Sequence, residues 1–191
     1  IPFDDVSRGL PGDNSDDQAR FIEGVFSTSG RSLRVVSLYL PNGNPTDDPK
    51  KFDYKIAWMD RLISWASERM KFEEALVLAG DYNVIPQGSD CWDESVWQGD
   101  ALFRHESRSR FEALKSLGFT EAIRASSEES GDYTFWDYQA GAWPKNHGIR
   151  IDHLLLSPEA ADLLNGSKID SFVRDWEKPS DHVPVLIDIA A

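Results

Sequence analysis

The stretch that organises this chain is LVLAGDYN, residues 76–83, in which a short apolar run is followed by Gly-Asp-Tyr-Asn. The apolar run predicts a buried strand, and Pro86 stops that strand from continuing. Side chains two positions apart on an extended chain point to the same side, so Asp81 and Asn83 should project together while Tyr82 faces the other way. A proton carrier and a hydrogen-bond donor are therefore predicted side by side at a strand end.

Two more predicted strands bring acidic and imidazole side chains to their ends. Asp152 lies at the head of the apolar run 151–156, and Asp181 with His182 precedes the run 183–187. Loops on a rigid strand scaffold commonly assemble active sites, so these groups are expected to gather with the first turn. From the residues alone, two simpler interpretations stay open: a polar turn that caps one strand, and a structural hydrogen-bonded pair between Asp152 and His182.

Length and composition indicate one globular domain over residues 1–191. The chain is 40% hydrophobic, which is enough for a sizeable core, and it is short for two domains. It has neither a run of about eighteen apolar residues nor a basic and apolar leader, which argues against a membrane partner. Cys91 is the single cysteine, so no intrachain disulfide can form and a cytoplasmic location is expected.

The formal net charge of -13 opposes non-specific attraction to a polyanion such as nucleic acid. A nucleic-acid partner would require a divalent cation that neutralises clustered carboxylates, or a local basic face. Candidates for such a face cluster in the last third of the chain: Lys145, His147, Arg150, Lys168, Arg174 and Lys178. Ordinary solvated surface charges are the alternative interpretation of the same residues.

Alternating strand and helix patterns predict an α/β fold with a mixed sheet. Residues 1–20 are rich in turn formers and are predicted to be irregular. The predicted strands are 21–26 and 33–40, joined by a turn at 27–31, then 76–79, 133–138, 149–156 and 183–187. The predicted helices are 52–71, 109–118 and a short segment capped by Ser157, with a long loop over 86–107.

Four segments, in this order, closely resemble the exodeoxyribonuclease III branch of the AP endonuclease family. They are Gly80-Asp81-Tyr82-Asn83, Tyr133-Thr134-Phe135-Trp136-Asp137-Tyr138, Gly148-Ile149-Arg150-Ile151-Asp152 and Lys178-Pro179-Ser180-Asp181-His182-Val183-Pro184-Val185. The Gly-Asp-x-Asn and Ser-Asp-His motifs are shared across the endonuclease/exonuclease/phosphatase superfamily, whereas the Trp-Asp-Tyr and Lys-Pro-Ser-Asp-His segments point to its DNA-repair branch. The resemblance implies part of a four-layer α/β sandwich, in which helices flank two mixed β-sheets.

The resemblance implies a catalytic role for four polar residues. Asp81 would be the general acid/base, and Asn83 would hydrogen-bond the phosphoryl oxygens, because phosphodiester hydrolysis needs proton transfer and stabilisation of charge on those oxygens. His182 would contact the scissile phosphate. Asp152 would accept the other ring proton of that histidine and so fix its tautomer.

The same resemblance assigns residues to substrate and metal. Tyr39, as a catalytic residue, and Asn42 would contact the phosphate region, and Arg150 would bind substrate. Asp181 would be a metal-associated carboxylate. Mg²⁺ suits an all-oxygen site with few protein ligands and several waters, and Mn²⁺ is the alternative cation. Without the resemblance, Tyr39 is an aromatic strand residue and Asn42 a turn residue.

Phe135, Trp136 and Trp143 match the family's aromatic loop, which senses an extruded abasic sugar. A flat apolar pocket favours a sugar without its base, because an attached base would collide with the pocket. Packing in the core is the alternative interpretation of these three aromatic residues. His153 is interpreted as a packed strand histidine.

The resemblance begins part-way into the family pattern. Relatives carry an upstream strand with an Asn and a Leu-Gln-Glu motif whose Glu is the principal magnesium ligand, and this sequence starts at Ile1 without them. The chain is therefore expected to be the carboxyl-terminal part of a longer enzyme, incomplete at its amino-terminal end and weakly active or inactive. Surfaces that the upstream segment would cover are expected to offer a homodimer interface.

The resulting prediction is a magnesium-dependent DNA-repair phosphodiesterase, a 3′-5′ exodeoxyribonuclease and AP endonuclease. Its partner would be double-stranded DNA with abasic sites or 3′ ends. Two alternatives stay open: a non-catalytic module that binds DNA or a protein, and a superfamily phosphatase that acts on phospholipid or inositol phosphates. Phosphate affinity without turnover would favour the first alternative, and a preference for abasic duplex would exclude the second.

Overall fold

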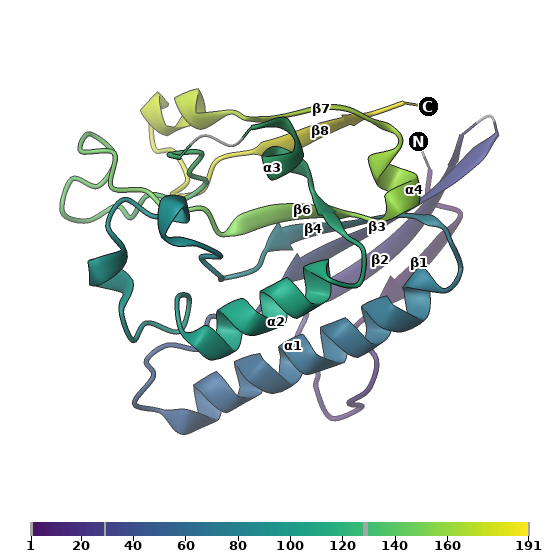
Figure 1. Cartoon of the computed structure of the whole chain (residues 1–191), viewed down its shortest axis with the longest axis horizontal. Helices are drawn as coiled ribbons and strands as arrows, with labels where there is room; N and C mark the ends of the chain where they lie inside the picture. The colour runs from purple at the N-terminus through teal and green to yellow at the C-terminus, as the bar shows by residue number, and fades with distance from the viewer. Residues whose placement is uncertain (1, 29, 128–129, 191) are drawn as a thin grey trace.

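The computed structural model describes residues 2–28, 30–127 and 130–190 and contains two β-sheets with helices packed against them (Figure 1). The larger sheet has the strand order β1-β2-β3-β4-β6-β5. Its strands are β1 Asp5–Arg8, β2 Phe21–Thr28, β3 Arg31–Tyr39, β4 Ala75–Asp81, β5 Thr120–Glu121 and β6 Asp152–Leu156. The smaller sheet pairs β7, Leu164–Ile169, with β8, Val185–Ile189. Because β3 and β4 run parallel while the other pairs of the larger sheet are antiparallel, the predicted mixed α/β fold is confirmed.

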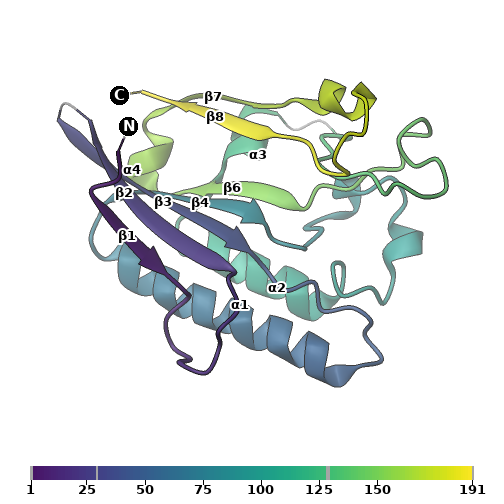
Figure 2. The same ribbon diagram turned by 180° about the vertical axis from the view of Figure 1, so that it is seen from behind.

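Two long helices cover one face of the larger sheet, and the smaller sheet lies over the other face (Figures 1 and 2). The long helices are α1, Pro49–Met70, and α2, His105–Lys115. The shorter helices α3, Ala122–Ser126, and α4, Pro158–Ala161, lie on the side of the smaller sheet. Short 3-10 turns cover Gly88–Asp90, Glu94–Trp97 and Ser171–Asp175.

The main apolar core fills the space between the larger sheet and its two long helices. Buried side chains include Val36, Trp58, Leu62, Leu78 and Tyr82. A second cluster lies between the two sheets, where Val77, Leu154 and Leu156 pack with the partly exposed Val185, Ile187 and Ile189. In the part of the chain that the structure describes, no helix has the length and apolar character needed to cross a membrane.

Several predicted boundaries differ from the observed ones. Strand β1 lies in the segment predicted to be irregular, because pairing with β2 orders it. The predicted strand 133–138 is wrong: Phe135 makes single-residue bridges to Ile149 and His182, so no continuous ladder forms there. Helix α2 begins at His105, inside the predicted long loop, and β7 was not predicted. Residue 29 of the predicted turn lies outside the described residues.

Gly80 controls the contact between the two parallel strands. Its φ is +150° and it lies opposite Leu38 in the β3–β4 register. A Cβ atom placed on Gly80 would lie 1.9 Å from the carbonyl oxygen of Leu38, far inside any real contact. The residue before Asp81 must therefore be glycine for β4 to reach the strand end in this register.

Replacing Gly80 by Ala should lower the free energy of unfolding by on the order of 3 kcal/mol or prevent folding, because backbone atoms of β3 would have to move. Gly166→Ala is the matched control, since a Cβ there meets open space. Urea denaturation of Gly166→Ala should give a stability within about 0.5 kcal/mol of wild type. Equal stability of Gly80→Ala and wild type would contradict the observed register.

Candidate active site

Three strand ends lie in one row at the edge of the larger sheet. Tyr39 at the end of β3 pairs with Asp81 at the end of β4, which pairs with Asp152 at the start of β6. Directly paired residues on neighbouring strands point to the same face, so the register alone brings these three side chains together. The Tyr39 side chain is half exposed, with the guanidinium of Arg20 5.0 Å from its ring centre.

Asp81 and Asn83 do project together, but a turn rather than strand alternation brings them there, because β4 ends at Asp81 and Asn83 has a φ of +47°. The backbone N–H of Asn83 donates to Asp81 Oδ1 at 2.7 Å, and Asn83 Nδ2 lies 3.1 Å from Asp81 Oδ2. The same Nδ2 donates to the carbonyl of Leu40 at 2.9 Å, and Asn83 Oδ1 accepts from Asn42 Nδ2 at 2.8 Å. The Asx turn and the shared face are therefore one arrangement, which fixes the amide of Asn83 on all sides.

Asp152 orients His182 as predicted. His182 Nδ1 lies 2.9 Å from Asp152 Oδ2, which assigns the ring proton to Nδ1 and leaves Nε2 as the acceptor when the ring is neutral. The Phe135 ring packs edge-on against the imidazole, with ring centres 5.0 Å apart at 64°. The imidazole is therefore held by one polar and one apolar contact, with Nε2 turned away from Asp152.

Burial and like charge change the acid–base properties of this cluster. Burial, with the charge of Asp152 as the second cause, raises the pKa of Asp81 to about 7. Burial opposes the positive charge of His182, but the hydrogen bond and charge of Asp152, with the charges of Asp81 and Asp181, outweigh it and raise the pKa of His182. A carboxyl group whose pKa is raised to about 7, beside an imidazole whose pKa is also raised, is suited to proton transfer.

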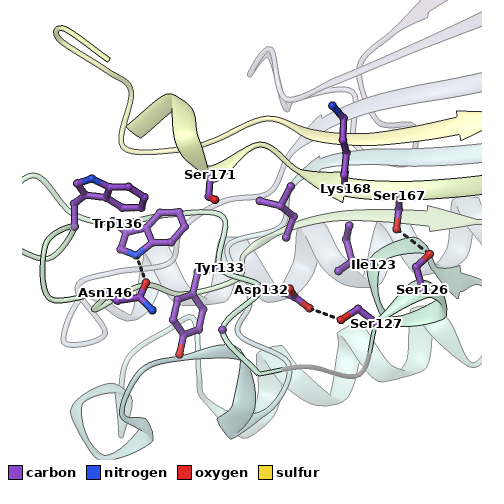
Figure 3. Close-up of a pocket in the computed structure, with 13 residues that line it drawn as sticks. Ile123, Ser126, Ser127, Asp132, Tyr133, Trp136, Asn146, Ser167, Lys168 and Ser171 are labelled. Atoms are coloured by element: carbon purple, nitrogen blue, oxygen red, sulfur yellow. Dashed lines mark hydrogen bonds between the residues drawn. The ribbon is translucent and has the colours of Figure 1, made fainter. Parts of the chain in front are cut away.

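The three predicted aromatic residues do not form one surface. Phe135 contacts His182, whereas Trp136 and Trp143 pack edge-on against each other with ring centres 4.9 Å apart. Trp136 is buried, and its indole N–H donates to Asn146 Oδ1 at 3.1 Å. Both tryptophans line a pocket of about 400 Å³ beside α3 and β7, whose walls include none of the row residues or His182 (Figure 3).

The structure corrects the assignment of Arg150 to substrate. Its side chain is 2% exposed, and its guanidinium lies 3.0 Å from Asp90 Oδ1 and 3.1 Å from Glu121 Oε1. The guanidinium of Arg150 also lies 3.0 Å from Nδ1 of His153, which is buried as predicted. These partners are internal and the side chain is almost fully buried, so the guanidinium is not presented at the surface where a ligand would bind. Arg174 is also buried, so the predicted basic face loses two of its members.

Two buried cations that support the site were not predicted. Arg174 donates to the carbonyls of Ser180 at 2.7 Å and Trp136 at 3.1 Å, and so connects the two loops that flank His182. Lys55 lies on α1 beneath the Asp81 turn. Lys55 lies three or four positions from apolar residues of the same helix. That spacing would have predicted that its side chain is on the buried face.

The carboxylates do not form a ready metal cage. Among the residues that the structure describes, no three His, Cys, Asp or Glu side chains lie close enough to hold a metal ion together. Asp181, the predicted metal residue, lies beside His182 and its Oδ1 is 3.4 Å from Ser180 Oγ. A carboxylate such as Asp181 could contribute to binding a hard cation only together with waters or other oxygen ligands.

Asp81 and His182 are proton-carrying groups held at the ends of strands. Such groups are suited to hydrolysis by general acid–base catalysis. The chain belongs to the endonuclease/exonuclease/phosphatase family, whose sequence pattern matches residues 1–182. It is 29% identical over 187 residues to exodeoxyribonuclease III of Haemophilus influenzae. The aligned region covers 94% of this chain and 70% of that protein.

Solved structures extend the comparison. The 3′ phosphatase NExo from Neisseria, determined with a product DNA hairpin, superimposes with a TM-score of 0.91 at 35% identity. An AP endonuclease from Archaeoglobus fulgidus gives a TM-score of 0.90 at 29% identity. Each match covers 100% of this chain and 72% of the other one.

The raised pKa of Asp81 predicts that the protein loses stability as pH rises. Between about pH 4 and pH 7 the unfolded chain releases this proton while the folded site retains it, so ionisation favours unfolding. The expected loss over this window is roughly 1–3 kcal/mol, since one pKa unit corresponds to about 1.4 kcal/mol.

Urea denaturation in EDTA checks this expectation by comparing wild type with Asp81→Asn. The unfolding free energy of wild type minus that of the variant should fall between about pH 4.5 and 7.5. Asp188→Asn, which removes one exposed carboxylate from β8, is the control for the loss of the same charge away from the site. A flat curve for Asp81→Asn would show that the Asp81 carboxyl is not held in its protonated form.

Proposed function

We propose that this protein hydrolyses phosphodiester bonds in DNA, at abasic sites and at 3′ ends, with a divalent cation. The observation that carries the proposal is the row of Asp81 and Asp152 with His182, with the Asn83 amide fixed beside it. The names of the relatives, exodeoxyribonuclease III and AP endonuclease, supply the substrate class.

The proposed chemistry uses Asp81 and His182 as the groups that carry protons. Asp81 takes a proton from the attacking water, whose oxygen forms the new bond to phosphorus as the bond to the leaving oxygen breaks. Asp81 then gives this proton to the leaving oxygen, so that the carboxyl returns to its starting state. His182, protonated on Nε2 and held by Asp152, donates to a non-bridging phosphate oxygen, where negative charge develops.

The cation enters this proposal only as a bound group. Asp181 is the described carboxylate that would hold Mg²⁺ or Mn²⁺ beside His182. When bound, such a cation would neutralise charge on the phosphate. The protein residues orient the phosphodiester and move the proton.

Removal of a 3′ phosphate is the second candidate activity. The Neisseria protein at 35% identity is named a 3′ phosphatase and was determined with product DNA. The same residues could serve a phosphomonoester at a DNA end, because the attack on phosphorus and the proton transfers are the same. The two activities differ in the leaving group and are separated by substrate.

The test is cleavage in Mg²⁺ of three labelled duplexes: one with an abasic analogue, one with a recessed 3′ hydroxyl end, and one with a 3′ phosphate. The protein is the natural polypeptide that contains residues 1–191 with any residues that flank them. Asp81→Asn should lower kcat by roughly 100-fold or more, and His182→Asn by a similar factor.

Asp188→Asn serves as the control, because it removes the same charge from an exposed position on β8. It should keep wild-type kcat. Wild-type protein that cleaves none of the duplexes in Mg²⁺ or Mn²⁺ would refute the nuclease proposal. Activity on the 3′ phosphate alone would favour the second candidate, and equal activity of Asp81→Asn and wild type would remove Asp81 from the chemistry.

A further inference from the structure

Lys55 is a fully buried ammonium directly beneath the candidate site. It projects from α1, its exposed fraction is 0%, and its Nζ donates to the carbonyl of Asn83 at 2.6 Å and to the carbonyl of Asn42 at 3.0 Å. These carbonyls belong to separate loops, one after β4 and one after β3. One side chain therefore bonds the main chain of both site loops.

The burial of this charge is costly. Desolvation lowers the pKa of Lys55 to about 7, and the charges of Asp100 and Asp81 offset only part of that effect. An apolar side chain such as Met would fill a similar volume without the cost of desolvation. It would leave the buried carbonyl of Asn83 and the carbonyl of Asn42 without this donor, so what Lys55 supplies is the connection between the loops.

The loop after β3 is shaped around the lysine stem. Gly43 has a φ of +87°, and a Cβ atom on it would lie 2.7 Å from Cδ of Lys55. The next residue, Asn44, donates through Nδ2 to both carboxylate oxygens of Asp100 at 3.1 and 3.2 Å. The stem and the ammonium together thus fix the path of the backbone from Asn42 to Asn44.

The two carbonyls that Lys55 binds belong to the two asparagines whose side chains meet at the site. Asn42 Nδ2 donates to Asn83 Oδ1 at 2.8 Å, and Asn83 in turn contacts both carboxylate oxygens of Asp81. Fixing both carbonyls fixes the separation of the two backbones. The amide–amide contact and the orientation of the Asp81 carboxylate depend on that separation.

We propose that Lys55 is a positioning residue, which clamps the loops of Asn42 and Asn83 from below and thereby orients Asp81 for catalysis. This inference rests on the proposed function for its catalytic consequence, while its structural claim stands independently. Lys55 itself does not touch substrate, because the Asn83 turn lies between its ammonium and the surface.

The test compares Lys55→Met, Lys55→Gln and Lys55→Arg with Arg61→Met. Arg61 is the matched control because it lies on the same helix and also donates to a main-chain carbonyl, that of Leu10 at 2.7 Å, away from the site. Lys55→Met should lower kcat by roughly 10- to 100-fold with KM changed less than about threefold, since orientation rather than affinity is lost. Lys55→Arg should restore part of kcat, and Lys55→Gln should lie between the two.

A second readout needs no activity. The side-chain amide signals of Asn42 and Asn83 in ¹⁵N-resolved NMR spectra should shift and exchange faster with solvent in Lys55→Met, and should be unchanged in Arg61→Met. If Lys55→Met proves unfolded, Lys55→Gln and Lys55→Arg provide both readouts.

Wild-type kcat in Lys55→Met, or a loss of kcat equal to that of Arg61→Met at the same loss of melting temperature, would overturn the positioning role. Unchanged asparagine signals in Lys55→Met would overturn the clamp itself. Wild-type protein without cleavage would refute the proposed function, and the NMR comparison would still decide whether the clamp exists.

Discussion

Backbone hydrogen bonds among β3, β4 and β6 place Tyr39, Asp81 and Asp152 in one row. The geometry of the site follows from this register, because a slip of one residue would turn each side chain to the opposite face of the sheet. Gly80 makes the register attainable by letting β4 pass the carbonyl of Leu38. The row is thus set by main-chain pairing among these three strands and not by contacts between the side chains of the site.

The acidity of the chain and its proposed anionic substrate are reconciled at His182. The net charge of -13 repels phosphate at long range, but that repulsion is screened beyond roughly 8 Å in physiological salt. Within that distance, the carboxylates of Asp152, Asp81 and Asp181 raise the pKa of His182 and so stabilise its protonated form. The acidic residues therefore create the local cation that a phosphate would contact, and two arginines expected to form a basic face are used inside the protein instead.

The sequence alone was sufficient for the parts of the site that depend on local order. The Gly-Asp-Tyr-Asn segment predicted that Asp81 and Asn83 lie together, although a turn and not an extended chain achieves it, and the family resemblance placed Asp152 on His182. The sequence alone was insufficient where a side chain contacts a residue that is distant in the sequence. Arg150 lies in the family's own motif, yet its partners Asp90 and Glu121 come from distant segments, and only their contact shows that the guanidinium is internal. The pocket that the two tryptophans line could not be predicted for the same reason, since its walls on α3 and β7 are remote from them in sequence.

The loops around the row are gathered by buried cations where strand pairing ends. Lys55 binds the carbonyls of the loops after β3 and β4, and Arg174 binds the carbonyls of Trp136 and Ser180 in the loops that flank His182. Carbonyl groups that converge at a strand end present the negative ends of several dipoles to one another, and this arrangement is unfavourable without a donor between them. A lysine offers three donors and an arginine five, so one buried cation can satisfy carbonyls from two loops at once. Each cation supplies hydrogen bonds to carbonyls that have no partner strand. Together the two cations hold the loops of Asn42, Asn83 and His182 at the end of the sheet.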